Sequence, residues 1–387
     1  MQKIKIFIIV LIFILPIFSC LQIMRVSAES SQILDDAIQE NLEELDLSDL
    51  EEYLKNFKFG EEEALKDRLI RYINGDSIDY SSLFLQVFEV FFQETLELFP
   101  QFACITAIAL LCGVLSALQF GSTDKTLAQI IYLIAFVCIL IPILSIVNEC
   151  FNTAKESLYN MQNQMEILFP ILLTLLIVSG GASTVAICKP SLAFLSTTMI
   201  RIISDLVFPI TLIIFAFLML NKISDDFKFA KFTLLLKSVN KWLIGLGLSI
   251  FGVFFSVQGL TAGGYDSIIK RATKYAIGNG IPIVGGFLSG GFDLAIAGSV
   301  LIKNSLGYLG VVLMIASVVK PLILLLSTTL LLRFTAAITS PFGESKISDF
   351  LSDTADVLNY FSAGILFTVF LYFLSIIVMI SATEAII

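Results

Sequence analysis

Residues 306–332 read LGYLGVVLMIASVVKPLILLLSTTLLL, an apolar run whose one charged side chain is Lys320. About 20 apolar residues are enough for a helix to cross the hydrocarbon core of a bilayer. The whole chain has the same character, with 57% hydrophobic residues, 15% charged residues and a mean hydropathy of +0.91. This composition excludes an ordinary soluble domain and predicts an all-α polytopic integral membrane protein.

Further apolar runs on both sides of this stretch are long enough to be membrane spans. The run at 190–220 is too long for one simple span, and Arg201 and Asp205 lie in its middle at i, i+4 spacing. They either pair on one helical face or mark a break between a re-entrant piece and a full span. We expect about six to eight membrane helices, including re-entrant pieces. The other runs are 102–118, 127–147, 167–187, 242–260 and 357–380.

Basic loops give the only indication of sidedness. The loop at 221–241 carries five Lys and two Asp, which favours the cytoplasmic side. Lys270, Arg271 and Lys274 in the next loop favour the same side. Because a single span cannot join two loops on one side, we expect a re-entrant segment between them.

The N-terminus has the three parts of a secretory signal peptide. Lys3 and Lys5 precede an apolar run at 6–18, and Val26-Ser27-Ala28 forms a small-residue cleavage site. Residues 1–28 are therefore predicted to be a cleavable signal peptide. A lipoprotein signal ending at Cys20 and an uncleaved anchor are the alternatives, and all three send residue 29 onward across the membrane.

The exported segment that follows, residues 29–80, is strongly acidic. It contains 16 acidic and 5 basic residues, whereas the whole chain has a net charge of -9. Its apolar residues recur at helical spacing, which predicts a small acidic helical extracytoplasmic segment. About fifty residues bury little core alone, so the segment is expected to rest on a partner or on the membrane body. A flexible acidic linker is the alternative.

Residues 81–100 are predicted to form an amphipathic interfacial helix that leads into the polytopic transmembrane domain at 101–387. Gln86, Glu89, Gln93 and Glu97 fall on one helical face, and Pro100 is expected to end the run. A channel-lining helix in an oligomer is the alternative, but a carboxylate-bearing face is costly in a lone span.

Enzymatic chemistry finds little support in the sequence. There is no His, the six Cys form no CxxC pair, and no HExxH or GxSxG motif occurs. We therefore predict neither an enzyme nor a metal or cofactor site.

A glycine-rich block at 263–310 holds 11 of the 23 glycines. Glycine lets helices approach closely or lets the backbone break in a membrane-embedded site. The block contains KRATKYAIGNGIPIVGG at 270–286, including Pro282, Gly285 and Gly286, and LIKNSLG at 301–307. With Gly180-Gly181-Ala182 ahead of Lys189-Pro190, these motifs resemble the stage III sporulation protein AE family over essentially the full chain.

This resemblance implies a role in endospore formation. Members of the family belong to a multi-protein complex in the mother-cell membrane around the engulfed forespore, where a forespore-side partner completes a secretion-like channel. The resemblance thus implies other subunits of that complex, and the lipid bilayer, as partners and gives no role in binding nucleic acid. It transfers no catalytic residues.

Charges within the apolar runs suggest a second hypothesis, an autonomous secondary transporter or permease with an intramembrane polar path. Lys320 needs a counter-charge, a wet cavity or an interface, whereas Lys303 is expected to snorkel to the headgroups. The candidate polar and packing residues are Arg201, Asp205, Asp293, Lys303, Lys320, Gly285, Gly286 and Pro282.

Overall fold

The computed structural model describes residues 38–39, 42, 45–56, 65–73, 80–118, 125–179, 185, 197–223, 229–253, 285–341 and 345–384. Within them it contains helices and no strands. Among the described residues, six helices are long and apolar enough to cross a membrane: Phe88–Val114, Gln129–Val178, Thr197–Ile223, Ala230–Val253, Ile296–Thr339 and Lys346–Ile380. The all-α polytopic prediction is confirmed, while the signal peptide, Pro282 and the basic residues at 270–274 lie outside the described residues.

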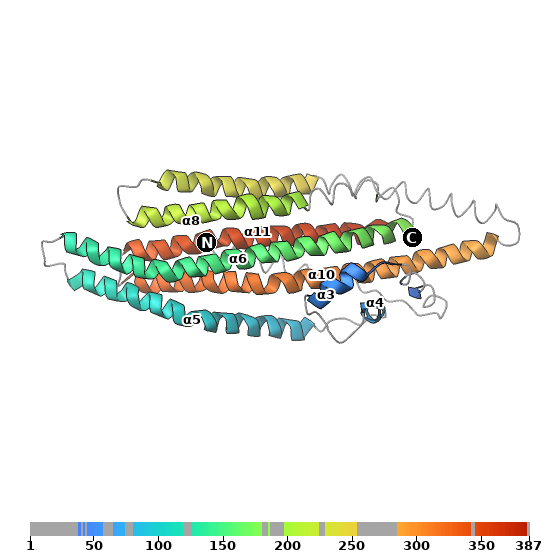
Figure 1. Ribbon diagram of the computed structural model, residues 1–387, viewed down its shortest axis with the longest axis horizontal. Coiled ribbons are helices and arrows are strands. Elements are labelled where there is room, and N and C mark those ends of the chain that lie inside the picture. Colours follow the sequence, from blue (N-terminus) through green and yellow to red (C-terminus); the bar gives the residue numbers. More distant parts are fainter. Residues whose placement is uncertain are drawn as a thin grey trace.

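Four long helices form an elongated bundle (Figure 1). They are α5 (Tyr80–Leu118), α6 (Lys125–Val178), α10 (Gly285–Thr339) and α11 (Ser345–Glu384). We call the end where α5 and α10 finish and α6 and α11 begin the turn end (Figure 1). The opposite end is the leader end, because α3 (Ser48–Asn56) and α4 (Leu65–Ile73) lie towards it (Figure 1).

The centre of the bundle is the pair α10 and α11. Among the side chains described at 346–380 in α11, all but Asp349 are buried or half-buried. Two glycines of α10 allow the close approach: a Cβ at Gly310 would lie 3.1 Å from Ile376 Cδ1, and one at Gly307 would clash with Ile380. Small residues at a helix contact let the backbones come together and increase dispersion contacts.

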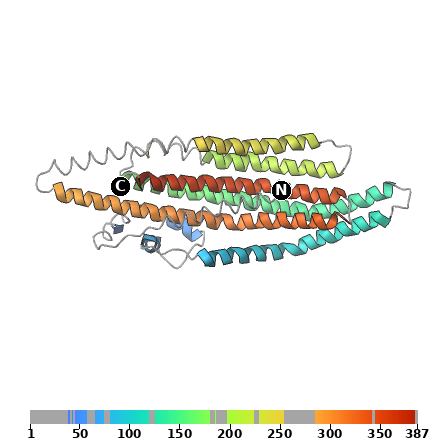
Figure 2. The same ribbon diagram turned by 180° about the vertical axis from the view of Figure 1, so that it is seen from behind.

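A helical hairpin packs against α11. Its first helix, Thr197–Ile223, contains a π-helical turn η2 (Ile203–Val207) followed by α8 (Phe208–Ile223). Its second helix is Ala230–Val253. Figures 1 and 2 both show the hairpin along one long side of the bundle and α5 along the opposite side.

The boundaries of the expected spans change in two places. The runs at 127–147 and 167–187 were expected to be separate spans, yet residues 125–178 form the single helix α6. The interfacial helix at 81–100 does not end at Pro100, because α5 continues through this proline to Leu118. Proline removes one backbone hydrogen bond and bends a helix, but a helix packed along its length tolerates that loss.

Gly364 of α11 offers a test of hairpin packing. A Cβ there would lie 2.7 Å from both Ile203 Cγ2 and Phe208 Cε1, which belong to buried side chains of the hairpin. We expect Gly364→Ala to lower the free energy of unfolding by about 1–3 kcal/mol through overpacking. Thermal denaturation in detergent measures the effect.

The matched control is Gly245→Ala in the second hairpin helix, where an added Cβ meets nothing within 4 Å. This change is expected to be neutral or to stabilise by up to about 1 kcal/mol, since alanine favours helix more than glycine does. Equal melting temperatures for the two variants would contradict the described packing.

Candidate functional site

A group of buried polar side chains surrounds the turn of α10 that precedes Pro321. Proline has no backbone N–H, so the carbonyl of Ser317, four residues earlier, loses its helical donor. Ser157 of α6 supplies a replacement: its Oγ donates to Ser317 O at 3.2 Å. Both serines are buried. A backbone group that the proline would leave unpaired is therefore satisfied by the neighbouring helix.

Gln164, about two turns further along α6, extends this group. Its Nε2 donates to Ser317 Oγ at 2.5 Å, to Leu313 O at 3.3 Å and to the hydroxyl of Tyr53 at 3.1 Å. The side chain is only 1% exposed. Within the part of the chain that the structure describes, its Oε1 has no hydrogen-bond partner, and neither does the hydroxyl of the fully buried Tyr372.

Tyr53 brings the leader helix α3 into the same group. Burial raises the pKa of its hydroxyl, partly offset by hydrogen bonds with Gln164 and Ser317, so it remains a neutral polar group at physiological pH. We call Tyr53, Ser157, Gln164 and Ser317 the polar seam. It joins α3, α6 and α10, and its chemistry is that of an uncharged hydrogen-bonding contact.

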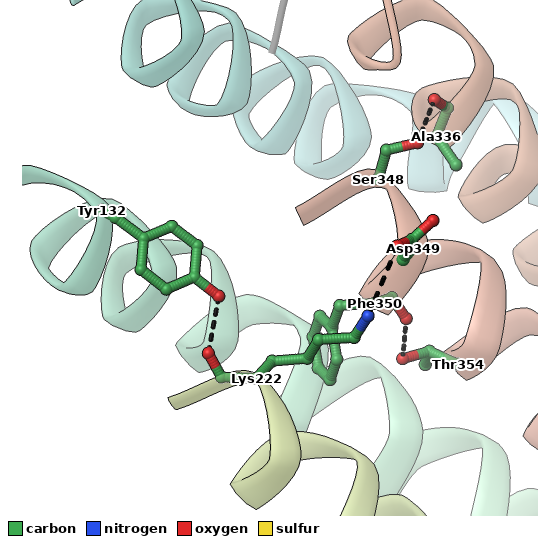
Figure 3. A network of polar contacts seen from close by, with 7 residues as sticks. All are labelled: Tyr132, Lys222, Ala336, Ser348, Asp349, Phe350 and Thr354. Atoms are coloured by element: carbon green, nitrogen blue, oxygen red, sulfur yellow. Dashed lines mark hydrogen bonds and ion pairs between the residues drawn. The ribbon is translucent and has the colours of Figure 1, made fainter. Parts of the chain in front are cut away.

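Charged residues gather instead near the turn end. Arg333 of α10 donates through Nη2 to Asp356 of α11 at 2.9 Å, and Lys222 at the end of α8 lies 3.6 Å from Asp349. The carbonyl of Lys222 also accepts a hydrogen bond from the Tyr132 hydroxyl of α6 at 2.7 Å (Figure 3). We call Lys222, Arg333, Asp349 and Asp356 the charged cluster.

The charged cluster holds four helices in register. Figure 3 shows Lys222 reaching from the hairpin to the first turns of α11, where Ser348 Oγ donates to Ala336 O of α10 at 2.8 Å. Tyr360 Oη donates to Lys237 O of the second hairpin helix at 3.4 Å. Because each contact crosses from one helix to another, the cluster fixes the hairpin on α11.

Lys303 is placed differently from the sequence prediction. It does not snorkel to the headgroups: its side chain is fully buried and its Nζ donates to Ile380 O near the end of α11 at 2.9 Å. A cation near the C-terminus of a helix is favoured by the helix dipole, which helps to offset the cost of burying the ammonium.

The other charged candidates are not brought together as a path. Arg201 and Asp205 are exposed, and neither forms an ion pair with the residues that the structure describes. The π-helical turn at 203–207 interrupts the α-helical spacing that would stack them. Lys320 is exposed on α10. Asp293, Gly285 and Gly286 lie in the first turns of α10, but the surroundings of their side chains are outside the description.

The π-helical turn has a polar contact that the sequence reasoning did not anticipate. Asn240 of the second hairpin helix is buried, and its Nδ2 donates to Val207 O at 3.3 Å and to Thr211 Oγ1 at 2.9 Å. This amide satisfies the backbone where the hydrogen-bond pattern changes. In the described residues, no group of three or more Cys, Asp or Glu side chains could hold a metal ion.

The polar seam was also missed by sequence reasoning, although a signal was present. Ser157 and Gln164 are seven residues apart on a stripe of buried small and apolar residues that includes Cys150, Ala154 and Met161. A polar residue on such a stripe needs a buried partner. Ser317, four residues before Pro321, could have been named as the site of that partner.

Comparison with known proteins identifies the family. The model of the family "Stage III sporulation protein AE" matches residues 65–383. The stage III sporulation protein AE of Bacillus subtilis (strain 168) is 29% identical over 321 residues, which cover 83% of this chain and 80% of that protein. No solved structure matches the chain. The chain belongs to the stage III sporulation protein AE family.

The link between Ser157 and Pro321 can be tested by a double-mutant cycle. Ser157→Ala leaves Ser317 O without a donor and should lower the free energy of unfolding by about 1–3 kcal/mol. In the background of Pro321→Ala, residue 321 regains an N–H for that carbonyl, so the same Ser157→Ala change should cost less than about 0.5 kcal/mol. Thermal or denaturant unfolding in detergent gives the four values.

Additive effects of the two substitutions would show that Ser157 does not replace the missing proline donor. Thr174→Ala is the matched control, since Thr174 Oγ1 donates to Pro170 O at 3.0 Å within α6 and is exposed. Its effect is expected to be the same with or without Pro321.

Proposed function

We propose that this member of the stage III sporulation protein AE family is a membrane subunit of the complex that connects the mother cell with the forespore. In this proposal the turn end of the bundle lies in the mother-cell membrane and the leader end projects into the space between the two cells. The observation that carries the proposal, together with the family, is the uneven distribution of exposed apolar side chains along the bundle.

Most exposed large apolar side chains lie towards the turn end, whereas Tyr159, Ile177 and Val178 of α6 are exposed further towards the leader end. On α6 they run from Ile130 to Leu144, and on the second hairpin helix from Phe232 to Val253. At 1.5 Å per residue the latter run is about 32 Å long, close to the roughly 30 Å of a bilayer core. We call this zone the membrane band. Its other members are Phe88, Phe92, Leu96, Phe99, Leu111, Val114, Leu206, Ile213, Leu330 and Phe334.

The exposed face of α6 becomes polar after Leu144, at levels that the hairpin part of the membrane band still covers, because Phe151 packs against Phe361 of α11 and Tyr360 meets Lys237 of the hairpin. Asn148, Glu149, Asn152, Lys155 and Glu156 are all exposed. One continuous helix of 54 residues is about 80 Å long, far more than one bilayer requires. The length of α6 therefore supports a bundle that continues out of the membrane into water.

The orientation rests on charge. Lys222, Lys231 and Lys346 lie near the turn end, and an excess of Lys and Arg favours the cytoplasmic side. The leader then lies on the extracytoplasmic side, in agreement with the export signal expected at residues 1–28. The six candidate spans among the described residues support a start of α5 and an end of α11 on the same side.

The leader helices have an outer face suited to a partner. Their apolar residues, including Leu50, Leu54, Leu69 and Ile73, are buried, and Tyr72 packs edge-on against Tyr308 of α10 at 5.0 Å between ring centroids. Asp46, Asp49 and Glu52 remain exposed. Because the apolar residues of the leader are already covered, recognition of another subunit would depend on these exposed carboxylates of the leader.

Cysteine labelling tests the placement in the membrane. In a chain without native cysteines, expressed in cells that are not sporulating so that the leader faces the medium, Glu52→Cys should react with a membrane-impermeant maleimide added outside intact cells. Ile134→Cys, in the membrane band, should not react, and Ser340→Cys at the turn end should react only after permeabilisation. Reaction of Ser340→Cys in intact cells would show that the orientation is the opposite of the one proposed. Rapid labelling of Ile134→Cys would contradict the placement of the membrane band in the bilayer.

Deletion of residues 30–79 tests the role in an assembly. The variant should still reach the membrane, because the six spans remain, but recovery of the other complex subunits from sporulating cells and heat-resistant spore yield should fall by about tenfold or more. Normal recovery and normal spores would contradict the proposal.

Lys320→Met, measured in the same assay, distinguishes the assembly proposal from the transporter hypothesis. Its side chain is exposed and takes no part in the polar seam or the charged cluster, so complex recovery and spore yield should be unchanged. Loss of spores with full recovery of the complex would instead support an autonomous transporter whose path includes Lys320.

A further inference from the structure

The first half of α5 presents an acidic and apolar surface. Glu89, Gln93 and Glu97 are exposed at i, i+4 spacing, and Gln93 Nε2 donates to Glu97 Oε1 at 3.2 Å. Phe88, Phe92, Leu96 and Phe99 lie beside them, each more than half exposed. The Phe88 and Phe92 rings pack edge-to-face with centroids 4.8 Å apart, which makes a firm apolar ridge. We call these seven residues the acidic face.

The second hairpin helix presents a surface of the opposite charge. Lys231 and Lys241 are exposed, and Trp242, the only tryptophan of the chain, is 66% exposed. Around them lie further exposed apolar side chains, and Gly245 has open space where a Cβ would be. We call this surface the basic face; its remaining members are Phe232, Leu234, Leu235, Leu246 and Leu248.

The two faces lie on opposite sides of the molecule. In Figures 1 and 2 α5 follows one long side of the bundle and the hairpin follows the other, with α6, α10 and α11 between them. The acidic face of one copy can therefore not reach the basic face of the same copy. It can reach that of a neighbour placed alongside in the same orientation.

The two faces also overlap in their position along the long axis of the bundle. Arg333 and Asp356 mark one level in α10 and α11. Thr95 of α5 is 2.9 Å from Ser327, six residues before Arg333, and Lys237 of the hairpin meets Tyr360, four residues after Asp356. At 1.5 Å per residue, Glu97 and Glu89 then fall within about two helical turns of Lys231 and Lys241.

We infer that a second copy of this chain docks here, with the acidic face of one copy against the basic face of the next. Carboxylates and ammonium groups exposed within the membrane band are costly in contact with lipid alone, whereas an oppositely charged protein surface compensates them. All copies share one orientation in a membrane, so the axial overlap of the two faces is preserved between neighbours. The contact is head-to-tail and can repeat into a closed ring or an open row.

Charge reversal tests this contact in purified protein, without reference to sporulation. The double variant Glu89→Lys/Glu97→Lys and the double variant Lys231→Glu/Lys241→Glu should each reduce self-association in nanodiscs by about tenfold or more, because like charges would meet. Mass photometry and co-capture of two differently tagged copies measure the association.

Complementation decides whether the two faces meet each other. Mixing the two double variants should restore association, and so should the quadruple variant that carries all four reversals. Failure of both to restore it, with correctly folded proteins by thermal denaturation, would overturn the inference. A monomeric parent protein would overturn it as well, and would indicate that lipid or a different protein covers the faces.

Lys155→Glu/Glu156→Lys is the matched control. These two exposed residues of α6 lie outside both faces, and the swap preserves net charge. It should leave association unchanged. An equal loss in this control would show that association is a general effect of surface charge. Because this assay needs no other subunit, its outcome is separate from that of the leader deletion in sporulating cells.

Discussion

Close packing of α10 against α11 supports every other contact in the bundle. Gly307 and Gly310 remove the side chains that would hold the two helices apart, and Ile376 and Ile380 fill the space. The ion pair between Arg333 and Asp356 then sets the register of the helices near the turn end. The hairpin and α5 pack against this pair from opposite sides (Figures 1 and 2), so their separation depends on it.

An apolar environment requires that every backbone polar group finds a partner within the protein. Proline in α10 and the π-helical turn before α8 both disturb the helical pattern, and in both places a side chain from another helix repairs it. Ser157 serves Ser317, and Asn240 serves Val207. Buried polar residues in this bundle therefore act first as backbone partners, and Gln164 adds a link to the leader helix through Tyr53.

The length of α6 allows the bundle to extend beyond one membrane. The α6 helix keeps one buried stripe along its whole length, while its exposed face changes from apolar at Leu144 to polar at Asn148. A subunit with these properties can combine anchorage in one membrane with a protein surface beyond it. The acidic outer side of the leader and the two oppositely charged faces of the bundle supply different surfaces for different partners.

Sequence alone determined the class of the protein, because runs of about 20 apolar residues have few stable solutions other than membrane helices. It also determined the family, through the order of motifs such as those at 270–286 and 301–307. It could not determine that 127–147 and 167–178 share one helix, since polar residues between two apolar runs are equally typical of a loop. Only the tertiary structure decided the fate of Lys303, which is buried against Ile380, and of Lys320, which is exposed. Both are charges in apolar runs, and their difference depends on which neighbouring helix lies beside each, a property that hydropathy does not contain.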